Sequence, residues 1–491
     1  MKYKNIVCLW ISVFLLGLGC DDYLDLNDPT NLNADNYWRN EADVKNTALA
    51  MYAMLTPGSW RYHEYYIGPG ILRGDDVLPL YEALRWDYIA AVPYFSNRPA
   101  NPCPDIIWNK MYDVIGQANQ ILRYIDGVTG MDEAAVNRYK AEVRAMRAYA
   151  HYELLRNFRQ IVIADSDPDG LDKLNRPLSS REGSWNFVVR ELSEAAPLLP
   201  KKWSDDQYGR ITSGAAMAFL GTAYLYQGNK MKEAEQTFKS VIADYDYELD
   251  DEFARLFDGS KETSNEIIFA QRFTADKNGT GYKYNNMAVA NYTSDDGGWY
   301  MWRPSDFLME SFREEKTTDG KYDKRMFGTV LWSEENVDVV FDGEPYTSSK
   351  TCFRKYTESK QAVSSMTSYA DYITMRYADV LLMLAEALTE QNKAPEAVPY
   401  LDQVRERAGL SKFGKTDTES VRAEIRRQRL LEFALESKRF YDLVRWGIVK
   451  EQLTEAKHIG AAAFVKGKHE YFPVPLSETN NNPKIDPDPN F

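Results

Sequence analysis

The chain has 491 residues, of which 44% are hydrophobic and 27% are charged, and its mean hydropathy is -0.51, a composition that fits a large globular body. The formal charge is -14, and no stretch collects Lys and Arg, which argues against nucleic acid as a partner.

The first 19 residues have the pattern of a secretory signal. Lys2 and Lys4 precede the apolar run IVCLWISVFLLGLG, which is too short to span a bilayer comfortably, and small residues stand before Cys20. In bacteria such a cysteine receives lipid after cleavage, although Gly17 stands where a leucine is usual. We therefore predict a signal peptide over 1–19 and acyl chains, palmitate among them, on Cys20. The alternative is an ordinary secreted protein with an unpaired N-terminal cysteine.

Apolar periodicity and composition divide the remaining chain. A tether over 20–40 leads into a single domain over 41–491, with helices expected at about 41–55, 105–245 and 371–460. Two stretches interrupt them. The first insertion, about 56–104, and the second insertion, about 246–370, are rich in glycine and aromatic residues, and strands are expected at 266–272 and 337–341. Long irregular segments in compact domains often carry function, so these two insertions form the expected ligand face.

The helices match a tetratricopeptide-like pattern in two places, where small residues let paired helices approach closely. Around residue 385 the pattern consists of Leu381, Leu384, Ala385 and Leu388 on one helix, then Ala397 and Leu401 on a second helix that begins at Pro395. The earlier copy consists of Met217, Leu220, Gly221, Tyr224, Gly228, Ala234, Phe238 and Val241. One hairpin cannot bury its apolar face alone, so we predict a mainly α fold, a solenoid of stacked helical hairpins.

Cysteine and histidine usage gives no catalytic or metal signature. After removal of Cys8 and lipidation of Cys20, Cys103 and Cys352 remain, and they could pair or be two buried thiols. The four histidines lack metal-ligand spacing, and no nucleophile elbow or phosphate loop occurs, so we predict no enzyme activity and no cofactor. A half calcium loop at Asp165, Asp167, Asp169 and Gly170 has Arg176 at the twelfth position, where an acidic ligand is needed, so no metal is predicted.

Aromatic residues in the insertions are candidates for ligand contacts, because Tyr and Trp offer an apolar plane and a polar edge. The first insertion offers Trp60, Tyr62, Tyr65, Tyr66, Asp75, Asp76, Trp86 and Tyr88, and the second offers Tyr282, Tyr284, Asn285, Asn286, Tyr292, Asp295, Asp296, Trp299, Tyr300, Trp302 and Arg303. From these we predict a ligand site of Trp86, Trp299, Asp76, Tyr88, Tyr292, Asp296, Trp302 and Arg303. The alternative is that the aromatics form small cores inside the insertions.

Three charged residues of KRFYDLVRWG, Arg439, Asp442 and Arg445, have helical spacing. We expect them to form ion pairs that lock the last hairpin, with a ligand site as the alternative.

Several segments together resemble the SusD/RagB family of outer-membrane lipoproteins. They are AEVRAMRAYAHYELLRNF, RELSEAAPLLP, GRITSGAAMAFLGTAYLYQGN, MRYADVLLMLAEAL, LDQVRERAGL, RLLEFALESKRFYDLVRWG and YFPVPLSETNNNPKI, and they cover nearly the whole chain in order. The sequence departs from the family pattern at Gln428, where Glu is usual, and at Ser437, where glycine is common.

The resemblance implies a lipid-anchored protein of the cell outer membrane that faces the exterior and binds oligosaccharide or polysaccharide. It also implies a SusC-like TonB-dependent transporter as the partner that receives the ligand. The alternative is a tetratricopeptide-like scaffold at the cell surface that holds a peptide or a protein in its concave face.

Overall fold

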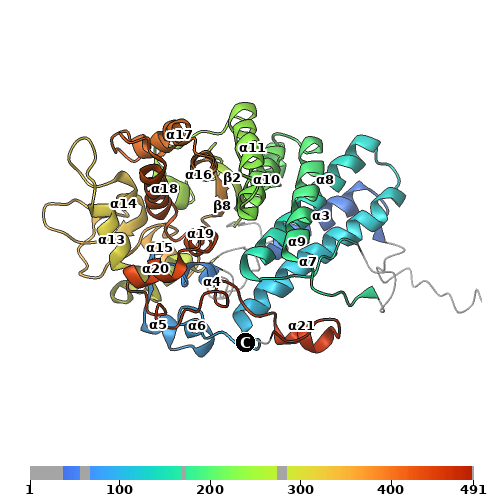
Figure 1. Cartoon of the computed structure of the whole chain (residues 1–491), viewed down its shortest axis with the longest axis horizontal. Helices are drawn as coiled ribbons and strands as arrows, with labels where there is room; N and C mark the ends of the chain where they lie inside the picture. Colours follow the sequence, from blue (N-terminus) through green and yellow to red (C-terminus); the bar gives the residue numbers. More distant parts are fainter. Residues whose placement is uncertain (1–36, 56–66, 167–172, 274–284, 489–491) are drawn as a thin grey trace, which may run out of the picture.

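A computed structural model of the chain describes residues 37–55, 67–166, 173–273 and 285–488. The predicted signal peptide, Cys20 and most of the predicted tether lie outside these residues. Long helices pack side by side in the order α3, α7, α8, α9, α10, α11, α16, α17 and α18 (Figure 1). Their bounds are α3 Glu41–Leu55, α7 Pro102–Tyr124, α8 Glu133–Asn157, α9 Arg181–Ala195, α10 Ser213–Gln227, α11 Met231–Asp244, α16 Tyr377–Thr389, α17 Ala394–Arg407 and α18 Thr418–Phe433. We call this row the helical frame, and it confirms the predicted solenoid.

The two tetratricopeptide-like hairpins, α10–α11 and α16–α17, are neighbours in space although the second insertion separates them in sequence, because α11 packs directly on α16. Close approach depends on small residues. A Cβ on Gly221 would lie 2.5 Å from the Phe238 ring, so only glycine lets α10 and α11 meet at this point. The turn after α10 is closed by Gly228, whose φ of +76° is in the left-handed region.

The start of the third helical region is a strand, which corrects the expectation of helix from residue 371. Tyr372–Arg376 forms β8 and pairs antiparallel with β2, Ile267–Gln271, which lies inside the predicted strand 266–272. The β8 segment leads straight into α16, so apolar periodicity alone does not separate the strand from the helix. The predicted strand 337–341 is shorter than expected, since β5 contains only Val340–Phe341.

The two insertions consist of short elements, and more of them are helical than the sequence indicated. The first insertion contains α4 Gly68–Ile71, β1 Val77–Pro79, α5 Tyr81–Leu84 and α6 Asp87–Ala90. The second contains, besides β2 and β5, α12 Met287–Asn291, β3 Trp302–Pro304, α13 Asp306–Arg313, α14 Lys324–Thr329, β4 Val330–Leu331, β6 Glu344–Pro345, β7 Cys352–Phe353 and α15 Lys360–Ser364. The chain continues with α19 Arg439–Trp446, α20 Val449–Glu455 and α21 Leu476–Asn481.

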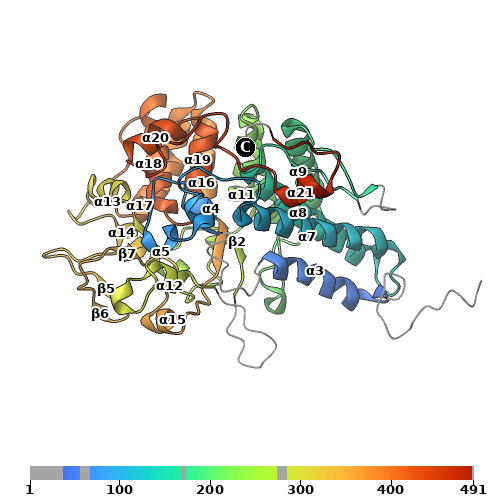
Figure 2. The same ribbon diagram turned by 90° about the horizontal axis from the view of Figure 1, so that it is seen from below.

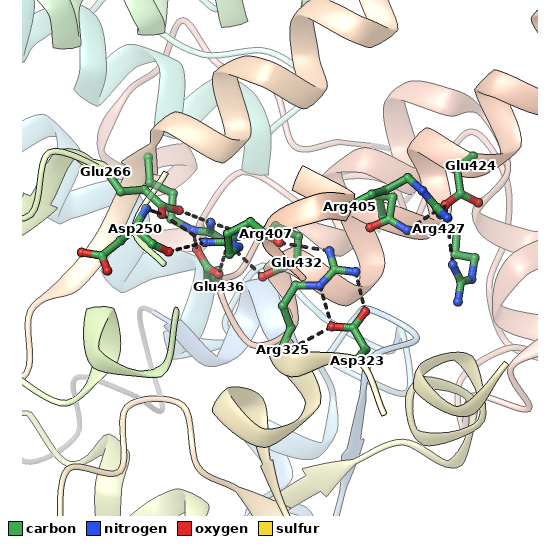
Figure 3. A network of polar contacts seen from close by, with 12 residues as sticks. Asp250, Glu266, Asp323, Arg325, Arg405, Arg407, Glu424, Arg427, Glu432 and Glu436 are labelled. Carbon is green, nitrogen blue, oxygen red and sulfur yellow. Dashed lines mark hydrogen bonds and ion pairs between the residues drawn. The ribbon is translucent and has the colours of Figure 1, made fainter. Parts of the chain in front are cut away.

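A buried network of charges joins the second insertion to the helical frame (Figure 3). Arg376 Nη1 lies 2.7 Å from Glu266, and its Nη2 lies 2.9 Å from Glu436. Glu432 accepts from Arg376, Arg407 and Arg325, the last at 3.1 Å. Arg325 is also 2.6 Å from Asp323, and Lys355 is 2.9 Å from Glu436.

Every charge of this network is matched. Burial alone would raise the pKa of the Glu432 carboxyl, but Arg407, Arg376 and Arg325 hold it well below its usual value. The same burial lowers the pKa of Lys355 to about 8, although Glu436 opposes the shift. Since a buried charge is tolerated only with its partners in place, the network fixes how α14, α17, α18 and the β2–β8 pair are arranged.

We expect Glu432→Gln to lower the free energy of unfolding by about 3–5 kcal/mol, the range for removing one partner of a buried pair, because three arginines lose their shared carboxylate. Urea denaturation of the soluble chain that begins after Cys20 measures the change. Glu252→Gln is the matched control, since Glu252 pairs with Arg255 at the surface, and it should leave the midpoint unchanged. Equal midpoints for Glu432→Gln and the wild type would contradict the assignment.

Candidate functional site

The two insertions meet through a short antiparallel pair of strands, β1 with β3. Leu78 lies opposite Arg303, and Pro79 lies opposite Trp302. The pairing continues on both sides, where the Leu80 amide donates to the Met301 carbonyl at 2.8 Å and the Ser305 hydroxyl donates to the Asp75 carbonyl at 2.6 Å. Figure 2 shows the blue first insertion beside the yellow second insertion, on the same side of the frame. Residues more than 200 positions apart therefore form one surface.

A cleft of about 540 Å³ lies where the insertions meet, and we call it the insertion cleft. Its most exposed rings are Tyr81, 73% exposed, and Trp86, 39% exposed. The lining residues are Leu80, Tyr81, Glu82, Arg85 and Trp86 from the first insertion and Ser294, Gly298, Trp299, Tyr300 and Met301 from the second. Flat apolar faces and polar groups thus alternate around one hollow, a lining that suits a ligand with both apolar faces and hydroxyl edges.

The sequence SDDGGWY places Trp299 and Tyr300 at this cleft through a tight turn. Gly297 has a φ of +89°, and a Cβ on Gly298 would lie 2.2 Å from the Tyr292 carbonyl oxygen, so both positions need glycine. The turn is followed by two amide hydrogen bonds, from Trp299 to the Val289 carbonyl at 2.7 Å and from Tyr300 to the Tyr292 carbonyl at 3.0 Å.

Tyr300 has a strained backbone, with a φ of +49° that is uncommon for a residue other than glycine. The strain is held by a hydrogen bond from the Tyr300 hydroxyl to the Thr351 carbonyl at 3.0 Å. Burial, the largest contribution, raises the pKa of this phenol, so the group remains a neutral donor. Strained backbone of this kind often occurs where a binding surface is held in a fixed shape.

Trp86 reaches the cleft from the junction between α5 and α6. It has extended backbone, with φ −101° and ψ 112°, between two single-turn helices, so the chain bends at this residue. The Arg85 guanidinium lies 5.3 Å from the Trp86 ring centroid, and Arg85 also pairs with Glu82 at 3.2 Å. The charged groups of the cleft therefore neutralise each other and leave hydrogen-bonding edges beside the ring.

The structure brings some of the predicted site residues together. Trp86 and Trp299 line the same cleft, and Tyr88 is half-buried with its ring 6.2 Å from that of Trp86. Asp296 is exposed two residues from Ser294, and its carboxylate accepts from the Thr293 hydroxyl at 3.0 Å. Arg303 lies on β3 and pairs with Asp306 at 2.8 Å.

Three predicted ligand residues are buried, and their placement corrects the prediction that they face a ligand. Trp302 is fully buried, and its Nε1 donates to Asn291 Oδ1 at 2.7 Å. Tyr292 is 2% exposed and packs on Phe341 with ring centroids 5.4 Å apart. Asp76 is also 2% exposed. The alternative interpretation, small cores inside the insertions, applies to these positions.

Asp76 has a structural role. Its Oδ2 accepts from the Leu435 amide at 3.0 Å, in a turn where Leu435 and Ser437 have left-handed backbone with φ of +67° and +54°. The conformation explains why glycine would suit position 437. Burial, and next the neighbouring carboxylate of Asp75, raise the pKa of Asp76 to about 7.

The sequence interpretation did not single out Tyr81, Glu82 and Arg85. The signal available was their position in a short segment, LYEALRW, that ends at Trp86. The candidates Trp60, Tyr62, Tyr65, Tyr66, Tyr282 and Tyr284 lie outside the described residues.

Arg439, Asp442 and Arg445 form buried ion pairs, as expected, although Arg439 has an unexpected partner. Asp442 pairs with Arg445 at 2.8 Å and with Arg429 at 2.7 Å, which joins α19 to α18. Arg439 instead lies 2.6 Å from Asp75, so it links α19 to the first insertion.

The remaining cysteines and the half calcium loop also have defined surroundings. Cys103 and Cys352 are both buried and are not paired with each other, which decides between the two alternatives for this pair. Arg176 lies 2.7 Å from Asp165 and so neutralises the only acidic residue of the half loop within the described residues. Across the described ranges, no three His, Cys, Asp or Glu side chains are grouped as metal ligands.

Fold and site define a class of protein: a solenoid of helical hairpins that carries an exposed aromatic cleft between two insertions. A model of the SusD family matches residues 265–491, and a model described as starch-binding associating with outer membrane matches residues 89–225. The chain belongs to the SusD/RagB family.

Individual relatives align with this chain over nearly its full length. SusD-like protein P2 of Formosa agariphila is 26% identical over 477 residues, 90% of each chain. A SusD superfamily protein from Bacteroides vulgatus superposes with a TM-score of 0.84 at 25% identity, over 93% of this chain and all of that one. A laminarin binding SusD-like protein superposes with a TM-score of 0.77 at 25% identity, over 92% of this chain and all of that one. In the part of the chain that the structure describes, no helix has both the length and the apolar character needed to cross a membrane.

We expect Asp76 to make the chain less stable as the pH rises from about 4 to 7. Its ordinary pKa of 3.8 is raised to about 7 in the folded chain, so within this window the native state holds a proton that the unfolded state has lost. Asp76→Asn removes this term, and its urea midpoint should fall less over the window than that of the wild type. Asp306→Asn, at an exposed position, is the control and should keep the wild-type slope. Parallel slopes for Asp76→Asn and the wild type would show that Asp76 is not the group concerned.

Proposed function

We propose that this protein is a surface-exposed, non-catalytic glycan-binding lipoprotein that delivers oligosaccharide or polysaccharide to a SusC-like TonB-dependent transporter. One observation carries the proposal: Trp86 and Trp299, more than 200 positions apart, line one exposed cleft at the junction of the two insertions. Tyr81 and Tyr300 add two further rings to the same cleft.

The chemistry of the cleft supports a sugar ligand. Indole and phenol faces stack on the C–H-rich faces of pyranose rings, and Glu82 and Arg85 can bond to hydroxyl groups. The cleft is exposed, so it admits part of a long chain without enclosing it. The laminarin binding relative supports the same ligand class. Tyr88, Asp296 and Arg303 are proposed to contact a bound glycan beyond the cleft itself.

The location follows from the N-terminal sequence. The signal peptide predicted before Cys20 would direct export, and the acyl chains proposed on Cys20 would hold the protein in the outer membrane, facing the exterior. The family description, starch-binding associating with outer membrane, supports this location. Delivery to a transporter explains why a binding protein without catalytic groups would be anchored at the membrane.

We expect Trp86→Ala and Trp299→Ala each to weaken glycan binding about thirty-fold, because truncation of a central tryptophan costs about 2 kcal/mol or more. Isothermal titration with laminarin, starch and xylan measures the affinity. Leu198→Ala removes an exposed apolar side chain just after α9 instead, at a position that does not line the insertion cleft, and it should leave the affinity unchanged.

Each result decides between the proposed classes. Unchanged affinity in folded Trp86→Ala and Trp299→Ala chains would contradict the site. Binding of a peptide library, but of no glycan, would favour the peptide or protein scaffold. Release of shortened sugars during prolonged incubation would instead show a glycosidase.

We expect Cys20→Ser to abolish incorporation of labelled palmitate and to move the protein from the outer-membrane fraction to the soluble fraction. Loss of the acyl chains removes the proposed anchor. Cys103→Ser, at a buried thiol, is the control for loss of a cysteine and should leave both the label and the fractionation unchanged. Persistent labelling of Cys20→Ser would place the lipid elsewhere.

A further inference from the structure

We propose that the helical frame carries a second carbohydrate-binding cleft, centred on Trp203, that takes an uncharged, hydroxyl-rich sugar chain. It is a hollow of about 600 Å³ between the loop before α10, the segment after α11 and β2. A neighbouring hollow of about 560 Å³ on the side of α3 and α8 shares Lys202, Trp203 and Arg210 with it, so the two adjoin. We call the combined hollow the frame cleft, and it has no lining residue in common with the insertion cleft.

Four aromatic side chains line the frame cleft: Trp203, Tyr208, Tyr245 and Tyr247. The Tyr245 and Tyr247 rings are stacked, with centroids 5.8 Å apart and planes 22° apart. Stacking fixes the two rings relative to each other, and an outer face of the pair can receive the C–H-rich face of a sugar ring.

The polar end of each ring is tied to the protein. Trp203 Nε1 donates to the Ile211 carbonyl at 2.9 Å, and the Tyr208 hydroxyl donates to the Glu262 carbonyl at 2.5 Å. The Tyr245 hydroxyl lies 2.7 Å from Ser213 Oγ, and the Tyr247 hydroxyl lies 3.4 Å from Thr212 Oγ1. The rings are therefore held in place before a ligand arrives, which reduces the entropy lost on binding.

Two arginines pack against two of these rings, those of Trp203 and Tyr208. The Arg210 guanidinium lies 3.9 Å from the Trp203 ring centroid, and that of Arg272 lies 4.6 Å from the Tyr208 ring centroid. Both arginines are engaged in ion pairs, Arg210 with Glu142 and Arg272 with Glu262 at 3.0 Å. The Trp203 and Tyr208 rings thus each have one face covered by an arginine whose charge is neutralised, and a ligand can stack only on the other face.

The charge of the lining favours a neutral ligand over an anionic one. Besides the paired arginines, Arg138 lies 3.8 Å from Glu41. The three lysines of the lining, Lys45, Lys201 and Lys202, are matched in number by three aspartates, Asp205, Asp244 and Asp246. A polyanion needs an excess of cations, which this lining lacks. Thr263, Ser264 and Asn265 add hydroxyl and amide groups on the side of β2, which suit sugar hydroxyls.

Two clefts on one chain would let a polysaccharide bind at both. The second contact is then intramolecular, so a long chain binds more tightly than a short one that fills one cleft at a time. A hexasaccharide should therefore bind with a stoichiometry of two, and the polysaccharide should bind more tightly than the hexasaccharide.

The test uses isothermal titration with laminarin and starch and with laminarihexaose and maltohexaose. Thr263→Trp places a large ring in the frame cleft from an exposed position and leaves the packed residues intact, and Thr263→Ala is its matched control. Tyr208→Ala, at a ring that is 38% exposed, tests the platform itself. Thermal unfolding confirms that each variant is folded.

We expect Thr263→Trp to reduce the hexasaccharide stoichiometry from two to one and to weaken polysaccharide binding about tenfold or more, with Thr263→Ala like the wild type. The Trp86→Ala/Trp299→Ala chain should keep one hexasaccharide site, which Thr263→Trp or Tyr208→Ala then removes.

The remaining outcomes separate the two sites. Loss of all binding in the Trp86→Ala/Trp299→Ala chain would overturn the frame cleft and leave the proposed function intact. Loss of all binding through Thr263→Trp alone would support the frame cleft and overturn the insertion cleft. Absence of binding to every probe in the wild type would overturn both.

Discussion

The structure depends on the buried charges around Arg376 and Glu432. Arg376 stands at the end of β8, and Glu432 lies in the last turn of α18, yet both are completely buried with Arg407, Arg325, Lys355 and their carboxylate partners. In a medium of low dielectric constant each of these charges is stable only if the others keep their positions. A shift of the second insertion relative to the helical frame would leave Arg325 and Lys355 without Glu432 and Glu436. Apolar packing alone would tolerate small displacements more easily, so the network fixes the position of an otherwise irregular segment.

The end of α18 and the turn that follows it, residues 432–439, also fix the position of the first insertion. Glu432 and Glu436 belong to the network, the Leu435 amide donates to Asp76, and Arg439, three residues after Glu436, pairs with Asp75. Asp75 and Asp76 stand immediately before β1, which pairs with β3 of the second insertion. Both insertions are thus attached to one turn of the frame and to each other. This triangle of contacts determines where Trp86 and Trp299 lie.

The sequence predicted the frame better than the site. Helical periodicity identified α3 with its exact bounds and both tetratricopeptide-like hairpins, because small residues such as Gly221 and apolar residues such as Phe238 repeat with helical spacing. Periodicity could not show that α11 packs on α16, and it did not reveal β8. In the second insertion, Trp299 and Trp302 are only three residues apart and have neighbours of similar type, yet Trp299 lines a cleft and Trp302 is fully buried. The difference comes from the turn at Gly297 and Gly298 and from the pairing of β3 with β1, which is a contact between distant segments.

Raised pKa values often mark catalytic acids, so the two carboxyl groups with a pKa of about 7, Asp76 and Asp371, need a structural explanation. Asp76 is 2% exposed and accepts a hydrogen bond from the Leu435 amide. Asp371 is 3% exposed, pairs with Arg272 and accepts a hydrogen bond from the Phe273 amide at 2.9 Å. Burial is the largest cause of both shifts, and neither carboxyl lines the insertion cleft or the frame cleft. The charged groups that do line the clefts are at least partly exposed or already paired. Both clefts therefore present held rings beside polar groups, an arrangement that supports the proposed binding of a sugar chain.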